Sequence, residues 1–321
     1  MKRLTFVSTS LALAAAALAQ TPPAPAAAAS GAGGPGYQSE RSFPAIPQGP
    51  WTGKRLPDGQ PDVQGHWSNT IANHNNFTDP QGGIINDPQA AGRRPLGPRE
   101  QRAPSRVSDP PDGQLPFQPW AAAKVKDFQE HFNHPTQPQY VEPLARCAPA
   151  GIPKSFYWHG YEIRQYPGAV VFLFNSGTRI VHLDDKPSLP EQLKLWNGDS
   201  RGRWEGNTLV VDVSNLNGKA LLGRSGEFTS ENVHVVERYI FAPDNQRYNY
   251  VATFDDPSVF TRPWTTTIPA KRWSEKDKPN GWHFEASINT TGAQPVLERD
   301  ERICTENNGG FGRGAAVARS R

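Results

Sequence analysis

The feature that most constrains the fold is a series of short β-branched and aromatic runs that begins near Tyr157 and continues to Ile303. Turn-forming residues such as Pro167-Gly168 separate the runs, and such residues are typical of hairpins. The sequence therefore predicts about nine strands. They span 161–166, 169–174, 178–183, 208–213, 233–241, 247–254, 260–268, 282–288 and 296–303.

The short connections between these runs leave little room for helices, which argues against a parallel α/β sheet. The sequence predicts a mainly β protein in which an antiparallel meander closes as a β-barrel or a strongly curved sheet. Closure is favoured because it removes exposed strand edges.

The N-terminus predicts export. Lys2 and Arg3 precede an apolar stretch that also contains Ser and Thr. The Ala17-Leu18-Ala19 segment at its end suits cleavage by signal peptidase after Ala19. This order predicts a signal peptide over residues 1–19 and a location in the periplasm or outside the cell. A membrane anchor is the alternative, but the stretch is shorter than the roughly 20 residues that a bilayer span requires. Residues 20–48 are rich in Pro, Ala and Gly, which predicts a disordered linker.

Residues 49–146 are dense in Pro and Gly, with scattered apolar anchors. Because proline is excluded from central strands, this segment is expected to wrap over the surface of a β domain at 147–304. One helix is predicted over 119–132, where Ala121, Val125 and Phe128 recur at helical spacing after Pro119. Residues 305–321 are expected to form a C-terminal tail.

Cys147 and Cys304 are the only cysteines. In an exported protein a lone pair has a single possible connectivity, so a structural disulfide is predicted. A reactive thiol is the alternative, but neither residue belongs to a Cys-x-x-Cys pair.

Three strings in the second half are distinctive. They are GDSRGRWEGNTLVVD at 198–212, VHVVER at 233–238, and an Asp256-Pro257 pair followed by TRPW at 261–264. With them the chain resembles, from about residue 51 onward, a large family of secreted proteins from environmental bacteria. Members of that family have no established activity, so the resemblance implies a shared fold and export and assigns no catalytic residue.

The run at 233–241 supplies the candidate catalytic residues. Period-2 alternation places His234 and Arg238 on one face and Glu237 on the other. A His or Glu that faced a barrel interior would be desolvated, which displaces its pKa toward the range that acid-base catalysis needs. Pairing of Glu237 and Arg238 with neighbouring strands on a wet surface is the alternative. Asp256 is a further candidate, because it stands beside Asp255 and paired carboxylates can cleave glycosides. Alternatively, its carboxylate accepts local hydrogen bonds in an Asp-Asp-Pro turn.

Guanidinium groups beside indole rings supply the candidate ligand-binding residues. Such groups bind carboxylates or sugar-like ligands through forked hydrogen bonds and stacking. Equally, these side chains can fix the geometry of tight turns. The candidates are Arg201, Arg203, Trp204, Arg262 and Trp264.

Several classes of function lack their signatures. The formal net charge is only +3 with interspersed signs, so no nucleic-acid partner is expected. The histidines are scattered without the spacing of a zinc site, so no metal is expected. No phosphate loop, dinucleotide fingerprint or Gly-x-Ser-x-Gly elbow is present, so no nucleotide cofactor is expected.

Three functional hypotheses remain. The first is a periplasmic or secreted enzyme of acid-base type, a lyase or hydrolase, that acts on a sugar-derived or aromatic small molecule. The second is a ligand-binding protein without turnover that uses an Arg and Trp clamp. The third is a structural role in the cell envelope. Convergence of titratable groups in a pocket would favour the enzyme, and an aromatic-lined pocket without them would favour the binder. The sequence leaves the oligomeric state open.

Overall fold

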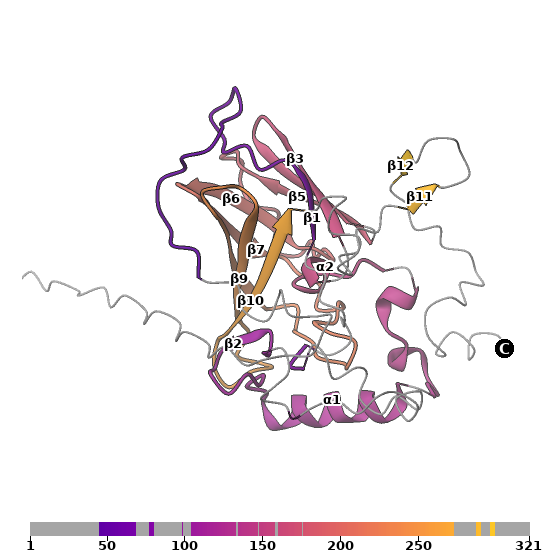
Figure 1. The fold of residues 1–321 in the computed structure, drawn as a ribbon. Helices are drawn as coiled ribbons and strands as arrows, with labels where there is room; N and C mark the ends of the chain where they lie inside the picture. The colour runs from indigo at the N-terminus through magenta and orange to yellow at the C-terminus, as the bar shows by residue number, and fades with distance from the viewer. Residues whose placement is uncertain are drawn as a thin grey trace, which may run out of the picture.

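A closed, nine-stranded β-barrel forms the body of the protein in the computed structural model (Figure 1). The structure describes residues 45–68, 77–79, 98, 104–132, 134–146, 148–157, 160–174, 176–272, 287–289 and 296–298. The predicted signal peptide, most of the predicted linker, Cys147, Cys304 and the tail at 305–321 lie outside these residues.

The barrel strands follow one another around the wall in the order β1-β3-β4-β5-β6-β7-β8-β9-β10, and β1 pairs with β10 to close it. Every neighbouring pair is antiparallel except β5 and β6. The strands are β1 (Gly65–Ser68), β3 (Gly160–Tyr166), β4 (Ala169–Phe174), β5 (Gly177–His182), β6 (Asp199–Glu205), β7 (Thr208–Ser214), β8 (His234–Phe241), β9 (Arg247–Asp255) and β10 (Trp264–Arg272).

The remaining elements are short. Strand β2 (Val107–Asp109) pairs with the first residues of β10. Strands β11 (Ser287–Asn289) and β12 (Val296–Glu298) pair with each other in a separate two-stranded sheet. Helix α1 (Pro119–His131) lies across one end of the barrel, and α2 (Lys154–Tyr157) lies between it and the strands (Figure 1). Two 3-10 turns, η4 (Pro138–Tyr140) and η5 (Pro143–Arg146), connect the helices. No helix among the described residues is long and apolar enough to cross a membrane.

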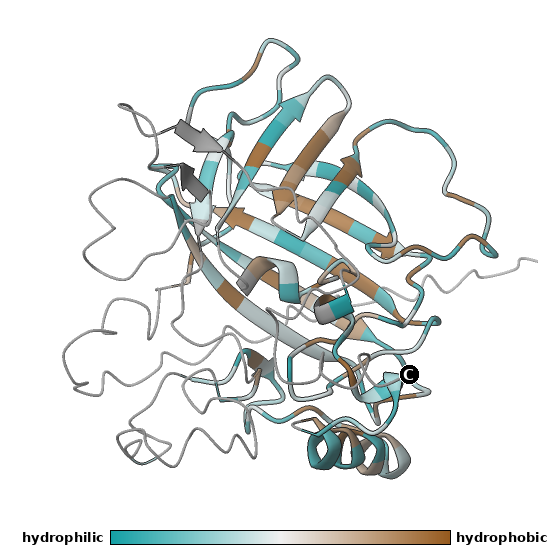
Figure 2. Cartoon of the chain, turned by 90° about the vertical axis from the view of Figure 1, so that its right-hand side faces the viewer, coloured by the Kyte–Doolittle hydropathy of each residue, from teal (hydrophilic) through white to brown (hydrophobic). Residues whose placement is uncertain are grey.

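Alternation along each strand decides what lies inside the barrel, as the hydropathy bands of Figure 2 show. In β8 the buried residues are Val235, Glu237, Tyr239 and Phe241, and the residues between them are more exposed. The interior is packed with aromatic rings rather than left open. The largest buried rings are Trp67, Trp264, Tyr161, Tyr239, Tyr248, Tyr250, Phe172 and Phe241.

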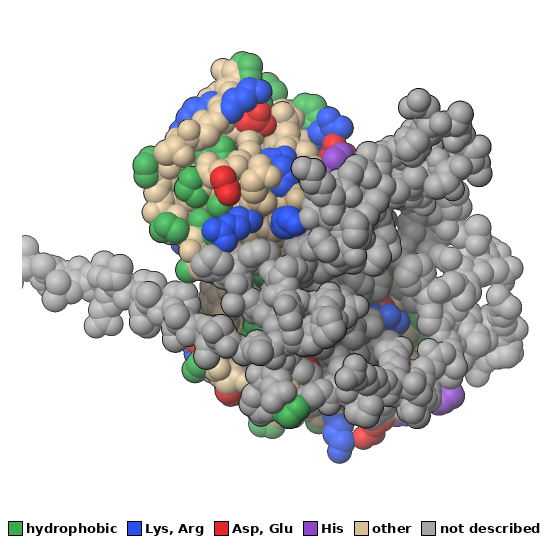
Figure 3. All heavy atoms as spheres, viewed as in Figure 1, with side chains coloured by type: hydrophobic (Ala, Val, Ile, Leu, Met, Phe, Trp, Pro, Cys, Tyr) green, Lys and Arg blue, Asp and Glu red, His purple; other side chains and the backbone are tan. Residues whose placement is uncertain are grey.

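Two different devices close the ends of the barrel. At the end near α1, the ring of Phe156 from α2 enters the interior and stacks on Tyr250 with centroids 4.5 Å apart. At the other end, Gln60 and Gln165 hydrogen-bond to each other and to nearby backbone groups. Charged side chains of both signs lie interspersed with apolar ones on the described face of the barrel in Figure 3.

The proline-rich segment does enter the sheet, so the expectation that it would only wrap over the surface is wrong. Residues Gly65–Ser68 pair with β3 on one side and β10 on the other, and the indole of Trp67 is completely buried. The strand is possible because it contains no proline, although prolines surround it. Two residues of the predicted linker pack on the barrel, since Ile46 is buried and Asn207 donates to the carbonyl of Pro47.

The predicted antiparallel meander is otherwise close to the observed one. The helix predicted over 119–132 is α1, and most predicted strands differ from the observed ones by one or two residues. The strand predicted at 260–268 begins later, at Trp264, because Phe260 belongs to the turn before it. Strand β6 was not among the nine predicted strands.

Candidate functional site

A buried ion pair lies in the middle of the barrel. Arg179 on β5 and Glu237 on β8 both occupy inward positions, and their side chains are almost fully buried. The two groups meet as a bidentate pair, with Nη1 to Oε1 at 2.9 Å and Nη2 to Oε2 at 2.6 Å. A buried charge is costly unless it is paired and hydrogen-bonded, so this geometry is what allows either residue to be inside.

Tyrosine and serine hydroxyls complete the network around the pair. Tyr250 donates to Glu237 Oε1 at 2.7 Å, and Tyr239 donates to Oε2 at 3.2 Å while accepting from Arg179 Nη1 at 3.1 Å. Ser200 Oγ on β6 accepts from Arg179 Nε at 3.1 Å and from Nη2 at 2.9 Å. These bonds use every N–H of the guanidinium and both carboxylate oxygens.

The pKa values follow from this arrangement. Burial alone would lower the pKa of Arg179, but Glu237 and the neighbouring tyrosines outweigh it and raise the pKa, so the guanidinium stays charged. Burial raises the pKa of Tyr239 and Tyr250 well above the usual tyrosine value, and the Glu237 carboxylate adds to the effect. Arg179 therefore stays charged and the Tyr239 and Tyr250 hydroxyls stay protonated near neutral pH, so these three groups support the pair electrostatically.

The barrel wall is weakest between β5 and β6, and we call this place the seam. The two strands run parallel and pair only at His182 and Arg201. Toward the start of each strand they diverge and leave a pocket of about 330 Å³. This seam pocket is lined by Thr178, Arg179, Ile180, His182, Leu189, Leu195, Trp196, Asn197, Gly198, Asp199 and Ser200.

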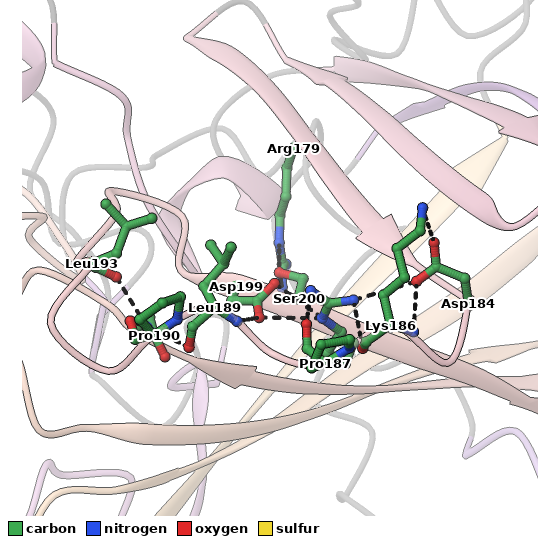
Figure 4. Close-up of polar contacts among 11 residues, drawn as sticks. Arg179, Asp184, Lys186, Pro187, Leu189, Pro190, Leu193, Asp199 and Ser200 are labelled. Carbon is green, nitrogen blue, oxygen red and sulfur yellow. Dashed lines mark hydrogen bonds and ion pairs between the residues drawn. The ribbon is translucent and has the colours of Figure 1, made fainter.

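The connection between β5 and β6 forms the outer wall of the seam pocket, and polar contacts fix it in place (Figure 4). Asp199 accepts from the backbone N–H of Leu189 at 2.9 Å and also pairs with Arg201. Arg201 donates in addition to the carbonyls of Lys186 and Pro187. On the far side, the amide of Asn215 donates to the carbonyls of Pro190 and Leu193.

Apolar side chains gather at the mouth of the seam pocket. Ile180 and Leu195 line it with exposed fractions of 47% and 36%, and Leu193 in the same connection is 47% exposed. Exposed large apolar residues are otherwise few in the described chain: only Trp120 and Tyr166 join them. Clustering of such residues around a concavity is typical of a binding site.

His182 is the only titratable residue of the pocket lining that makes no side-chain hydrogen bond with the described residues. It is half-buried and lies near Asp184. The Lys186 ammonium, which hydrogen-bonds to Asp184, holds the pKa of that carboxyl below its usual range, and His182 acts in the same direction.

The structure separates the predicted catalytic residues. Glu237 lies inside, in the desolvated setting that was expected of an interior position. His234 and Arg238 lie on the outer face, where His234 is 50% exposed and pairs with Asp212 at 2.8 Å. The outward position removes the physical reason for giving His234 and Arg238 a catalytic role. Asp256 is buried in a turn and accepts from Ser230 and Ser258, as the alternative interpretation expected.

The predicted Arg and Trp clamp is dispersed. Arg201 supports the connection beside the seam pocket, whereas Arg203 pairs with Glu205 on the surface and Arg262 pairs with Asp109. Trp204 packs on Phe241 with centroids 6.0 Å apart. Trp264 is a core residue that stacks on Phe254 at 4.4 Å. The clamp as predicted therefore does not form one site.

A second buried polar cluster lies outside the barrel, near α2. Lys154 hydrogen-bonds to Glu142, and Arg224 lies 3.5 Å from the second oxygen of the same carboxylate. Glu227 is buried nearby, and Lys154 contributes to its electrostatic surroundings. Burial raises the pKa of Glu227 to about 7.

Sequence reasoning did not select Arg179, Ser200, His182 or Trp196 as site residues. One signal was available for Arg179. It occupies the same face of its strand as Val181, so alternation placed a charge among apolar positions. A charge at an inward position requires a buried partner, and Glu237 was the matching acid. The pocket itself had no signal in the sequence, because it depends on how far the neighbouring strands β5 and β6 diverge in space.

The fold and the site together define a closed β-barrel protein with a small-molecule-sized pocket in its wall. Comparison with protein families, curated proteins and solved structures gave no match for the chain. Among the described residues, no group of three or more His, Cys, Asp and Glu side chains is placed to hold a metal ion. The resemblance to secreted environmental-bacterial proteins therefore stays a prediction.

Proposed function

We propose that the protein is a periplasmic or secreted ligand-binding protein that holds a sugar-derived or aromatic small molecule in the seam pocket, without a nucleotide cofactor. The observation that carries the proposal is the gathering of exposed apolar side chains around a polar floor made by Arg179 and Ser200. A volume of about 330 Å³ is at the lower end of the range for small-molecule sites, which suits a single ring with substituents.

Binding is favoured over turnover by the state of the charged groups. In the lining of the seam pocket, Arg179 is committed to Glu237, and Asp199 is committed to Arg201. A general acid or base must exchange a proton with the ligand, and a fully bonded ion pair resists this. Trp196, half-buried in the lining, offers a ring on which a sugar or aromatic ligand can stack.

The test is retention of a ligand by the purified mature protein. The protein would be incubated with a mixed extract of plant oligosaccharides and phenolics and separated from free solutes, and native mass spectrometry would identify retained masses. We expect a retained, unaltered small molecule. Trp196→Ala should weaken its affinity about tenfold or more, because a stacking surface is lost.

Trp120→Ala is the matched control, since Trp120 is an exposed tryptophan on α1 and does not line the seam pocket. It should retain the ligand as the parent does. Equal retention by the Trp196 and Trp120 variants would show that the ligand binds elsewhere, and the proposal would then be wrong.

An acid-base enzyme is the second candidate, and His182 is the observation that favours it. The His182 imidazole has no hydrogen bond with the described residues and lies near the Asp184 carboxylate, and a His beside a carboxylate can transfer protons. In the same incubation an enzyme would consume a mass and release a new one. Loss of that conversion in His182→Gln, with retention of substrate, would favour the enzyme over the binder.

A further inference from the structure

We propose that the seam pocket selects uncharged ring ligands that carry a hydrogen-bond acceptor, and that Ser200 sets this selectivity. The inference rests on the proposed function of the seam pocket as a ligand site. It departs from the expectation that arginine side chains recognise a carboxylate, because Arg179, the arginine that lines this pocket, has no N–H group to offer.

Arg179 cannot serve as an anion site in its present state. Its Nε–H and one Nη2–H are given to Ser200, and the other N–H groups are given to Glu237 and Tyr239. The charge of the guanidinium is also cancelled by a carboxylate at 2.6 Å. A ligand carboxylate that entered the pocket would lose its water shell and gain no unpaired cation, which is an unfavourable exchange.

Arg201 is largely committed on the outer side of the seam, where four of its five N–H groups have acceptors. It pairs with Asp199 at 3.2 Å and with Asp184 at 3.4 Å, and it donates to two carbonyls of the connecting loop. Lys186, the nearest ammonium along the loop, pairs with Asp184 at 2.9 Å and points to solvent with 78% of its side chain exposed. The pocket therefore presents balanced charges rather than a positive one.

Ser200 is the polar group at the floor of the seam pocket whose hydroxyl can still donate a hydrogen bond. Its Oγ accepts two N–H bonds from Arg179, and no described residue accepts its own O–H. Ser200 lines the seam pocket with only 1% of the residue exposed, so its hydroxyl proton lies at the bottom of the pocket, where an acceptor atom of a ligand that reaches the floor can take it. A carbonyl, ether or hydroxyl oxygen satisfies it without bringing a charge inside.

Isosteric pairs of probes test the selectivity directly. Benzamide and benzoate have nearly the same shape, as do glucuronamide and glucuronate, and each pair differs in charge at pH 7. Isothermal titration calorimetry with the full mature protein should show that the amide of at least one pair binds tenfold or more tightly than its acid. Equal or tighter binding of the acids would overturn the inference while leaving a ligand pocket in place. Absence of binding by all four probes at millimolar concentration would contradict the proposed function, and the inference with it.

Substitution of Ser200 gives a second, independent test. Ser200→Ala leaves two N–H groups of Arg179 unpaired beside the pocket, where a carboxylate can reach them as a forked acceptor. The ratio of benzoate to benzamide affinity should therefore rise at least tenfold.

Ser200→Thr keeps the hydroxyl and suits a strand, so it should preserve the parent preference for benzamide. Thermal melts of both variants would confirm that each is folded under the assay conditions. An unchanged affinity ratio in folded Ser200→Ala would show that Ser200 does not set the selectivity.

Discussion

Glu237 shows how much a single interior side chain can matter in this barrel. Its carboxylate balances Arg179 and accepts from two tyrosines at the same time. Glu237→Gln keeps the shape but leaves the guanidinium without a counter-charge. We expect the free energy of unfolding to fall by about 3–5 kcal/mol, measured by urea denaturation.

His234→Gln is the matched control, because it changes a side-chain contact with Asp212 on the outer face of the same strand. That pair is half-exposed and should contribute at most about 1 kcal/mol. Similar losses for the two variants would mean that the Arg179 and Glu237 pair is not desolvated as the structure places it.

The raised pKa of Glu227 predicts that the stability of the fold depends on pH. Its folded pKa, raised by burial to about 7, lies above the value near 4.5 expected in the unfolded chain. The folded state therefore keeps a proton that the unfolded state releases, and stability falls as the pH rises from about 4.5 to about 7. Glu227→Gln removes this loss, so it should stabilise the protein by roughly 3 kcal/mol at pH 8 and by little at pH 4.

The measurement is urea denaturation at both pH values, with Glu231→Gln as the control. Glu231 is exposed in the same loop and should give no pH-dependent gain. Lys154 is the charged side chain that acts on the Glu227 carboxyl, and Lys154 itself pairs with Glu142. An equal gain at pH 4 and pH 8 would contradict the burial of the Glu227 carboxyl.

At the scale of the secondary-structure elements, local pattern predicted most of the barrel. Strands such as 169–174 and 247–254 were predictable because they alternate and because turn residues bound them. Strand β1 was not, because the four residues Gly65–Ser68 are too short to show a period and prolines surround them. Its place is set by pairing with β3 and β10, which no local pattern encodes.

Substitution of Trp67 tests whether strand β1 closes the barrel. Its indole donates to the Val63 carbonyl at 3.0 Å and meets Phe241 and Tyr248 edge-on in the interior. Trp67→Ala should lower the free energy of unfolding by about 3–5 kcal/mol, because a large cavity would remain in the core. Trp120→Ala, at a 52% exposed site, should lower it by about 1 kcal/mol or less in the same urea titration. A small loss for Trp67→Ala would show that β1 is not part of the core.

For the whole molecule, the sequence predicted a closed β architecture but not where the wall would open. Closure follows from the need to remove strand edges. The opening follows from the single parallel pair, His182 with Arg201, which breaks an otherwise antiparallel wall. The candidate site was mislocated for the same reason. Residues chosen for their chemistry, such as His234, lie outside, while the pocket depends on the divergence of β5 and β6.

The interior of the barrel is occupied by its own aromatic rings and by the Arg179 and Glu237 network, and the seam is where a small molecule finds space. The proposed ligand site, its selectivity for uncharged rings and the structural role of the interior charges all depend on this division. A ligand that entered through another part of the wall would leave the exposed Ile180, Leu193 and Leu195 without an explanation.

Hydrogen–deuterium exchange of the purified protein, with and without the tightest-binding of the four probes, tests this division most directly. The structure predicts slower amide exchange on binding in peptides that cover 177–182 and 189–200, and unchanged exchange in peptides from β8 and β9. Protection at the outer face of β8, or protection that leaves 177–182 and 189–200 unchanged, would contradict a ligand site at the seam.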